Sequence, residues 1–313
     1  MIATAFSTSS TRPLQNVIRA LSPYLRNGAI INSVEGIPSS LDSVHDENIA
    51  ANSYFFSQLV WMQEWLRSVH RYPQFRERWH AVGADLDGKV AIDIGCGPGN
   101  VLKSLGGKPA IAIGVDVALG SLNLAKSLGY IPLHADAHSM PLRSSFADIV
   151  TLNATLHHCT DMEKVLLESA RLVRPGGMLV IDHDPHLSAW HFRGVGLLAW
   201  NLRKPVYRLL KRGGHRSEGE EQAWAEKTEV HHRPGDGVTE DMVRAALERQ
   251  DFTVDVYPHN HVVGAGVLES KTGRAASKIR WAQRLSGIDP DSSAAALSLM
   301  IVARKSARAD DCA

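Results

Sequence analysis

A short apolar stretch that runs into alternating glycines constrains the fold of this chain more than any other feature. Residues Val90–Ile94 are followed at once by Gly-Cys-Gly-Pro-Gly at positions 95–99. Glycine adopts backbone angles that other residues avoid, so this run permits a sharp turn from strand to helix and a close approach of ligand to backbone. The dinucleotide-binding pattern G-x-G-x-x-G would place its last glycine (or alanine) at position 100, where Asn100 stands.

Apolar runs and amphipathic segments alternate after this turn. Further strands are predicted at 110–115, 131–135, 148–152 and 178–181, and helices at 100–105, 118–128 and 162–173. This alternating order predicts an α/β fold with a parallel, doubly wound sheet whose strand–helix–strand crossovers are right-handed. In such sheets, ligands bind beyond the carboxyl ends of the strands. Polar residues stand at all five predicted ends: Asp93, Asp116, Asp136, Asn153 and Asp182.

Asp116 strengthens the case for a nucleoside ligand. It ends the strand that follows the glycine turn. A carboxylate in this position accepts hydrogen bonds from both ribose hydroxyls. NAD sites use the same arrangement, so Asp116 indicates a nucleoside without identifying it.

Four motifs at these strand ends resemble those of class I S-adenosylmethionine-dependent methyltransferases. Residues 93–99 look like motif I of that family, and residues 134–142 look like its adenine-contacting segment. Its small-molecule, ubiquinone-biosynthesis-like branch (type 11) has a fourth-strand signature similar to residues 146–150 and 156–158, and residues 174–177 match the turn before its fifth strand. The resemblance covers residues 85–184 and implies a Rossmann-like methyltransferase fold with a mostly parallel, seven-stranded sheet.

The resemblance also implies S-adenosylmethionine as the cofactor and gives roles to residues around its methionine part. Gly95, Gly97 and Gly99 would let the chain pass close to that part of the cofactor. Asp93 would orient the loop or reach the cofactor's amino group. The backbone carbonyl of Asn153 would face the same ammonium.

Other residues would bind the nucleoside part of the cofactor. The resemblance implies that Asp116 holds the ribose hydroxyls, that Asp136 accepts from the adenine amino group and that the Ala137 amide serves a ring nitrogen. Methyltransferases of nucleobase amines or glutamine amides commonly carry Asn/Asp-Pro-Pro-Tyr after the fourth strand. Residues 152–156 read Leu-Asn-Ala-Thr-Leu, so that class is not expected.

Histidines and acids near the expected pocket are the catalytic candidates. Methyl transfer to a hydroxyl needs a base to remove the proton. A base is less important for transfer to a thioether or a neutral amine. We expect His157, after the fourth strand, and His183 or Asp184, after the fifth, to contact the acceptor. His231 and His232, in a polar loop before a helix, are the next candidates.

A metal ion is not expected. The sequence Asp-His-Asp-Pro-His at 182–186 offers carboxylate and imidazole donors, which suit a divalent cation. Neighbouring donors in a short loop do not by themselves form a ligand pattern, however.

The regions outside the motifs suggest additions to a methyltransferase domain at 85–305. Residues 1–84 are predicted to form a helical cap or lid, with a strongly helical pattern over 45–72. Residues 185–238 are predicted to form a substrate-binding insertion. Its basic, amphipathic stretch at 187–212 either covers the pocket or contacts a membrane surface. Residues 306–313 form a tail.

Charge and hydropathy limit the partners. Lys and Arg total 34 and Asp and Glu total 33, so the basic excess of a dedicated nucleic-acid binder is missing. No apolar run is long enough to insert stably into a bilayer. We expect the substrate to be a small molecule and the protein itself to be cytoplasmic. The alternative is a mitochondrial protein, because residues 1–34 contain arginines but no acidic residue, as in transit peptides. The oligomeric state stays open.

Three hypotheses of function follow. The first is a methyltransferase of a small molecule, probed best with labelled cofactor. The second is a methyltransferase of an isoprenoid quinone or lipid at a membrane surface, which would use residues 187–212. The third is a nucleotide-dependent oxidoreductase or a non-catalytic cofactor-binding module. The methylated atom (oxygen, nitrogen, sulfur or carbon) is not indicated by the sequence.

Overall fold

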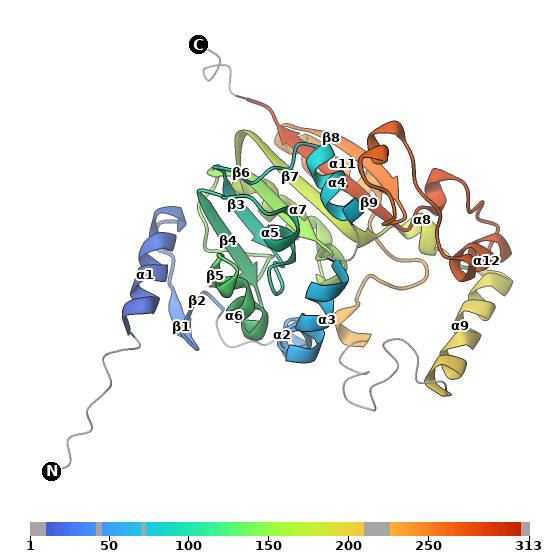
Figure 1. The fold of residues 1–313 in the computed structure, drawn as a ribbon, viewed down its shortest axis with the longest axis horizontal. Coiled ribbons are helices and arrows are strands. Elements are labelled where there is room, and N and C mark those ends of the chain that lie inside the picture. The colour runs from blue at the N-terminus through green and yellow to red at the C-terminus, as the bar shows by residue number, and fades with distance from the viewer. Residues whose placement is uncertain (1–10, 42–45, 70–72, 210–225, 308–313) are drawn as a thin grey trace.

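One mixed sheet forms the centre of the molecule (Figure 1). The computed structural model describes residues 11–41, 46–69, 73–209 and 226–307. Nine strands lie in the order β1-β2-β5-β4-β3-β6-β7-β9-β8. Their bounds are β1 Asn32–Val34, β2 Ile37–Ser39, β3 Val90–Ile94, β4 Ile111–Asp116, β5 Ile131–His134, β6 Ala147–Asn153, β7 Val173–Pro185, β8 Phe252–His259 and β9 Ser298–Lys305.

Parallel pairing brings the ligand-binding edge of the sheet together. Strands β5, β4, β3, β6 and β7 pair in parallel, and β9 is antiparallel to both β7 and β8. In this register Asp93 lies opposite Gly114 of β4 and Thr151 of β6. The carboxyl ends of β3, β4, β5, β6 and β7 therefore share one edge, which confirms the predicted α/β architecture with a mostly parallel sheet.

The predicted number of seven strands is wrong. The structure adds β1 and β2, a hairpin that turns at Glu35 and Gly36, both with positive φ. It joins the sheet where Ser39 pairs with His134 of β5. Strands of three residues are too short to show an alternating pattern, so this region was expected to be helical.

Helices cover both faces of the sheet. They are α1 Thr11–Leu21, α2 Glu47–Phe56, α3 Leu59–Val69, α4 Pro73–Ala81, α5 Asn100–Leu105, α6 Leu119–Ser127, α7 Met162–Leu172, α8 Leu187–Trp190, α9 Gly194–Leu209, α11 Glu240–Leu247 and α12 Ser277–Leu285. Ile92 and Ile94 of β3 pack in a core with residues of α7 and α11, whereas Ala91 packs in a second core with α4, α5 and α6. Side chains alternate along a strand, so coverage of both faces requires the continuous apolar runs seen in the sequence.

The helical stretch predicted at 45–72 is two helices. Asp46 caps α2 by accepting from the Asn48 amide at 2.7 Å. The chain breaks at Ser57, whose hydroxyl accepts from the Gly120 amide of α6. A Cβ on Gly120 would lie 2.6 Å from the Ser57 carbonyl oxygen, so only glycine allows this close approach.

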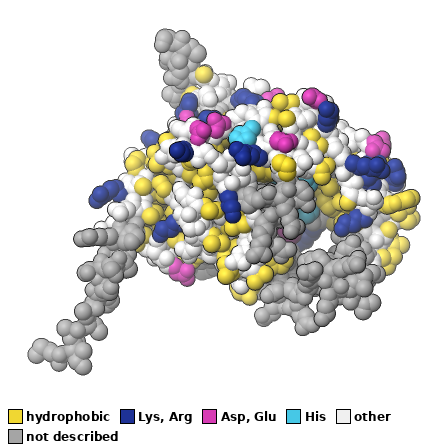
Figure 2. All heavy atoms as spheres, in the orientation of Figure 1, with side chains coloured by type: hydrophobic (Ala, Val, Ile, Leu, Met, Phe, Trp, Pro, Cys, Tyr) yellow, Lys and Arg dark blue, Asp and Glu magenta, His cyan; other side chains and the backbone are white. Residues whose placement is uncertain are grey.

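The segment after β7 carries α8 and α9, which lie beside α12 at one end of the molecule (Figure 1). Phe192, Trp200 and Ile279 belong to a third hydrophobic cluster there. The end of the predicted amphipathic stretch, at 210–212, lies outside the described residues, as do residues 1–10 and 308–313. No helix in the described ranges combines the length and apolar character needed to cross a membrane. Figure 2 shows basic and acidic side chains interspersed over the visible face.

Candidate active site

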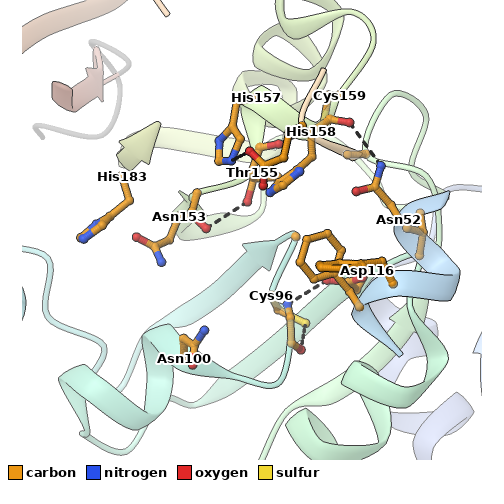
Figure 3. Close-up of a pocket in the computed structure, with 18 of the residues that line it drawn as sticks. Asn52, Cys96, Asn100, Asp116, Asn153, Thr155, His157, His158, Cys159 and His183 are labelled. Carbon is orange, nitrogen blue, oxygen red and sulfur yellow. Dashed lines mark hydrogen bonds and ion pairs between the residues drawn. The ribbon is translucent and has the colours of Figure 1, made fainter. Parts of the chain in front are cut away.

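A cavity of about 550 Å³ lies at the carboxyl edge of the parallel strands (Figure 3). Cys96 and Asp116 lie on one side of it, and His157 and His158 lie on the other. Segments far apart in the sequence contribute its wall: Asn48, Asn52, Phe55, Phe56, Trp61, Gly95, Gly97, Asp116, Asp136, Ala137, His138, Asn153, His157, His158, His183, Trp190, Glu229, His232 and His261.

The glycine turn forms the floor of the cavity at the end of β3. Gly95 has a φ of +65°, and a Cβ there would lie 2.5 Å from the Thr155 hydroxyl oxygen. Gly97 has a φ of +51°, and no heavy atom lies within 4 Å of its Cβ position. Gly95 is therefore required by packing against Thr155, which follows β6, whereas Gly97 leaves open space along the backbone for a ligand.

Asp116 connects the end of β4 to this turn. Its Oδ2 accepts from the Gly97 amide at 2.8 Å, and its Oδ1 accepts from the Ala118 amide at 2.8 Å. Burial raises the pKa of Asp116, and these amides oppose the rise. A carboxylate oxygen can accept two hydrogen bonds, so each still has capacity for a ligand hydroxyl.

Asp93 lies below the loop and does not line the cavity. It accepts from the Tyr130 hydroxyl at 2.6 Å and from the Thr151 hydroxyl at 2.8 Å. Tyr130 also accepts from the Leu102 amide and packs against Gly99. Asp93 thus supports the loop from inside. Tyr130 was not predicted as part of the site, because no sequence motif marks its contact with Asp93.

We predict that Asp93 makes stability depend on pH. Burial raises its pKa from 3.8 to about 7. Between these values the folded state binds the proton more than the unfolded state does, so stability falls as pH rises from about 4 to about 7. Asp93→Asn should remove this contribution. Urea unfolding of both proteins across that range should show the wild type losing stability relative to the variant, and a constant difference would contradict the assignment.

The cavity next to β5 is lined by Asp136, Ala137 and His138. Asp136 Oδ1 accepts from the His138 amide at 2.9 Å and lies 2.6 Å from Nδ1 of the same residue. Burial alone would raise the pKa of Asp136, but its bonds with His138 outweigh burial and lower it. Asp136 therefore presents an ionised carboxylate to the cavity.

Two amide side chains at the cavity have unused acceptors. Oδ1 of Asn153, at the end of β6, is buried without a hydrogen-bond partner, and Oδ1 of Asn100 is in the same state. Both residues line the cavity. Buried polar atoms are normally hydrogen-bonded, so these atoms favour a polar ligand here.

His157 occupies the other end of the cavity. Its Nδ1 lies 2.7 Å from Asp184 Oδ1, and its amide donates to the same oxygen at 3.1 Å. Burial lowers the pKa of His157, but Asp184 and Glu229 outweigh burial and raise it. Asp184 itself is buried behind His157 and does not line the cavity, so it orients the imidazole and does not reach an acceptor.

His183 lines the cavity near His261. Their rings stack with centroids 4.5 Å apart, and both residues have positive φ. Beneath them Asp182 is buried and accepts from Arg78. His261 was not predicted as a site residue, because it follows the end of β8 and no motif marks it.

Of the two neighbouring histidines in the polar loop before α11, one lines the cavity and the other does not. His232 lines the cavity, with Nδ1 2.9 Å from Glu229 Oε2. His231 does not line it, and its Nδ1 bonds to Asp236. Glu229 Oε2 also lies 3.6 Å from His157 Nε2, so the loop meets the end of β6 through this carboxylate.

Aromatic residues of the N-terminal helices complete the wall. Phe55, Phe56 and Trp61 line the cavity, and Asn52 donates to the His158 carbonyl at 3.4 Å. None of these four was among the predicted site residues. The helical pattern over 45–72 includes them, but spacing alone does not distinguish a core face from a pocket wall.

An α/β sheet with a ligand cavity beyond its parallel strand ends, floored by a glycine turn and flanked by Asp116, defines the Rossmann-like nucleoside-binding class. Residues 92–181 match the family model described as a methyltransferase domain. Over these residues the chain is similar to the class I S-adenosylmethionine-dependent methyltransferases, a family whose methyl donor is S-adenosylmethionine.

Curated relatives carry related names. A ubiquinone biosynthesis O-methyltransferase of Thiobacillus denitrificans is 32% identical over 157 residues, which cover 48% of this chain and 65% of the relative. A protein of the same name from Stutzerimonas stutzeri is 29% identical, with 48% and 65% covered. This chain thus spans just under two thirds of these relatives. A solved structure from Thermotoga maritima, titled a possible histamine N-methyltransferase, is 19% identical with a TM-score of 0.45 and covers 81% of this chain and 99% of that one.

Proposed function

We propose that this protein transfers a methyl group from S-adenosylmethionine to a hydroxyl group of a small, largely apolar molecule. The proposal rests on one cavity that has the glycine turn on one side and His157 on the other, with Asp184 buried behind His157. The names of the relatives, which specify transfer to oxygen in ubiquinone biosynthesis, support oxygen as the methylated atom.

The residues at the nucleoside end fit the cofactor. Asp116 would hold the ribose hydroxyls, Asp136 and the Ala137 amide would bind the adenine, and the open backbone at Gly97 would face the methionine part. Carboxylates and unpaired amide oxygens also suit a ligand with cationic sulfonium and ammonium groups. When bound, the cofactor would supply the methyl group from its sulfonium sulfur. The new oxygen–carbon bond would replace the carbon–sulfur bond, whose electron pair stays on sulfur, and the hydroxyl proton would pass to a base of the protein.

The cluster formed by His157, Glu229 and His232 is suited to removing that proton. All three side chains line the cavity. Asp184 fixes the orientation of the His157 ring through Nδ1, which leaves Nε2 directed toward Glu229. A hydroxyl held at this cluster loses its proton within the cavity, while Asp184 stabilises positive charge behind it.

The remaining wall favours an apolar acceptor. Phe55, Phe56 and Trp61 from the N-terminal helices and Trp190 from α8 line the cavity and exclude water. We therefore propose that the described helices of the N-terminal segment 1–84, α2 and α3, cover the pocket and that the described part of residues 185–238 helps to bind substrate. The interspersed surface charge and the net charge of +1 favour a small molecule over a nucleic acid.

The cofactor assignment predicts a loss of binding on Asp116→Ala. Hydrogen bonds to a charged group contribute about 1–3 kcal/mol, so calorimetry should show S-adenosylmethionine binding weakened by that amount. Asp255→Ala is the control, because Asp255 lies on β8 in a surface ion pair with Arg304. Equal affinities in wild type and Asp116→Ala would contradict the role of Asp116.

A further inference from the structure

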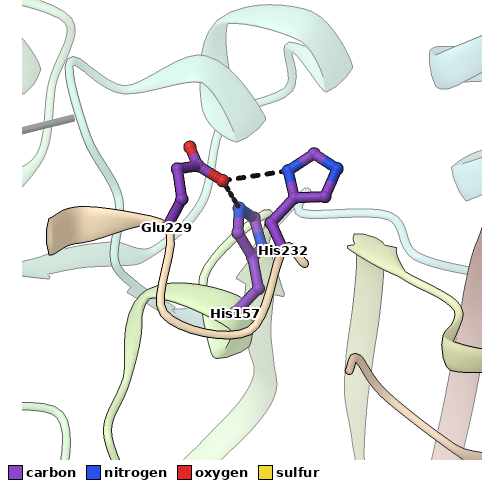
Figure 4. Close-up of side chains that lie close together, drawn as sticks. All are labelled: His157, Glu229 and His232. Carbon is purple, nitrogen blue, oxygen red and sulfur yellow. Dashed lines mark hydrogen bonds and ion pairs between the residues drawn. The ribbon is translucent and has the colours of Figure 1, made fainter. Parts of the chain in front are cut away.

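We infer that His157, Glu229 and His232 form a binding site for one divalent transition-metal ion (Figure 4). The site lies at the acceptor end of the cavity. The binding of the ion is argued from geometry alone; its role in activating a hydroxyl rests on the proposed function.

The three donor atoms already converge. Glu229 Oε2 lies 3.6 Å from His157 Nε2 and 2.9 Å from His232 Nδ1. One donor atom from each residue lies within 4.8 Å of the other two. Donors that each lie about 2.0–2.2 Å from a shared ion are roughly 3–3.5 Å apart, so small side-chain movements would complete the site.

The hydrogen bond from Asp184 argues for a cation between the donors. Because Nδ1 of His157 bonds to Asp184 Oδ1, a neutral ring carries its proton there and has its lone pair on Nε2. That lone pair faces the Glu229 carboxylate, so two acceptors oppose each other. A proton or a metal ion placed between them removes the conflict.

Asp184 also matches a recurrent feature of metal sites. Histidine ligands commonly donate their second ring nitrogen to a carboxylate, which orients the ring and raises its basicity. Asp184 is buried, and its Oδ2 has no hydrogen-bond partner. Its charge therefore adds to that of Glu229 in favouring a cation at this position.

Three protein ligands leave a coordination position open. All three residues line the cavity, so that position faces the acceptor end. Two imidazoles and one carboxylate suit zinc, iron, cobalt or nickel, whereas magnesium prefers oxygen ligands. An acceptor hydroxyl that binds the ion would lose its proton more readily, as metal-bound water does. The metal-bound and protonated clusters are two states of the same residues.

This proposed site differs from the one considered at 182–186. The sequence led us to expect no metal, and the cobalt titration below decides between that expectation and this inference. The donors of that loop diverge: Asp182 pairs with Arg78, and His186 Nδ1 bonds to the Ala296 carbonyl. The sequence could not reveal the new cluster, because His157 and Glu229 come together only through the fold.

Cobalt titration tests the inference. The full-length protein is stripped with a chelator and titrated with Co²⁺, with visible absorption reporting coordination and calorimetry with Zn²⁺ giving affinity. We expect one ion per chain. Glu229→Gln and His232→Ala should each weaken binding at least 10–100-fold, the loss typical even of second-shell changes. His231→Ala should bind normally, because His231 lies outside the cavity.

The outcomes separate this inference from the proposed function. Absence of saturable Co²⁺ binding, or equal binding by wild type and both ligand variants, would overturn the metal site. Both ligand side chains are 39% exposed, so the variants are expected to fold, which circular dichroism would verify. Cofactor binding and methyl transfer by the stripped wild type are measured in parallel. Their survival without metal binding would refute the metal site alone.

Discussion

Replacing His157 with alanine is expected to lower turnover by about 10²–10⁴-fold, the usual contribution of a proton-transfer group. Affinity for S-adenosylmethionine should stay nearly unchanged, because His157 lies across the cavity from Asp116 (Figure 3). Steady-state kinetics with an active acceptor would measure the first effect, and calorimetry would measure the second.

The pH profile of the wild type supplies a further readout of His157. The pKa of His157 is raised above its usual 6.5 by Asp184 and Glu229, despite burial. Proton removal needs the unprotonated ring, so activity should fall as pH decreases through that raised pKa. The groups facing the ring are Asp184, Glu229, His158 and His232. His231→Ala is the matched control, and normal turnover in His157→Ala would remove His157 from the site.

Arg78→Met is expected to destabilise the fold by about 3–5 kcal/mol, the cost of leaving a buried charge without its partner. Arg78 and Asp182 are both fully buried and lie 2.8 Å apart. Burial would raise the pKa of Asp182, but Arg78 holds it well below its usual range. The Trp79 indole and His259 also bond to Asp182, so several elements depend on this carboxylate.

Urea unfolding compares this variant with Arg76→Met. Arg76 is on the same helix but is exposed and contacts only His80 in the described bonds, so its loss should cost less than about 0.5 kcal/mol. Similar losses in the two variants would show that the buried pair does not stabilise the fold.

The architecture was predictable because its signals are local. The glycines at 95–99, and the apolar runs that alternate with helical segments, indicate where β3 to β7 end. Parallel pairing then places Asp116, Asp136 and Asn153 at one edge of the sheet. These residues line the cavity; their binding of the cofactor stays a prediction. The hairpin of β1 and β2 escaped prediction because it is specified by pairing with β5.

The acceptor end was harder to predict because it depends on contacts between distant segments. Asp182 and Asp184 are two residues apart on β7, so the alternation of side chains along the strand does not distinguish them. In the structure Asp184 orients His157, whereas Asp182 pairs with Arg78. Glu229 was only part of a polar loop in the sequence. It meets His157 only in the folded protein, because the two residues are far apart in the sequence.

Methyl-labelled S-adenosylmethionine tests the central claim most directly. The protein is incubated with this donor and with matched panels of phenols, alcohols, amines and thiols, and products are identified by mass spectrometry. We expect label on the oxygen of an apolar hydroxyl compound, with transfer strongly reduced in His157→Ala. Calorimetry that detects no binding of S-adenosylmethionine, or label only on nitrogen or sulfur with no dependence on His157, would contradict it.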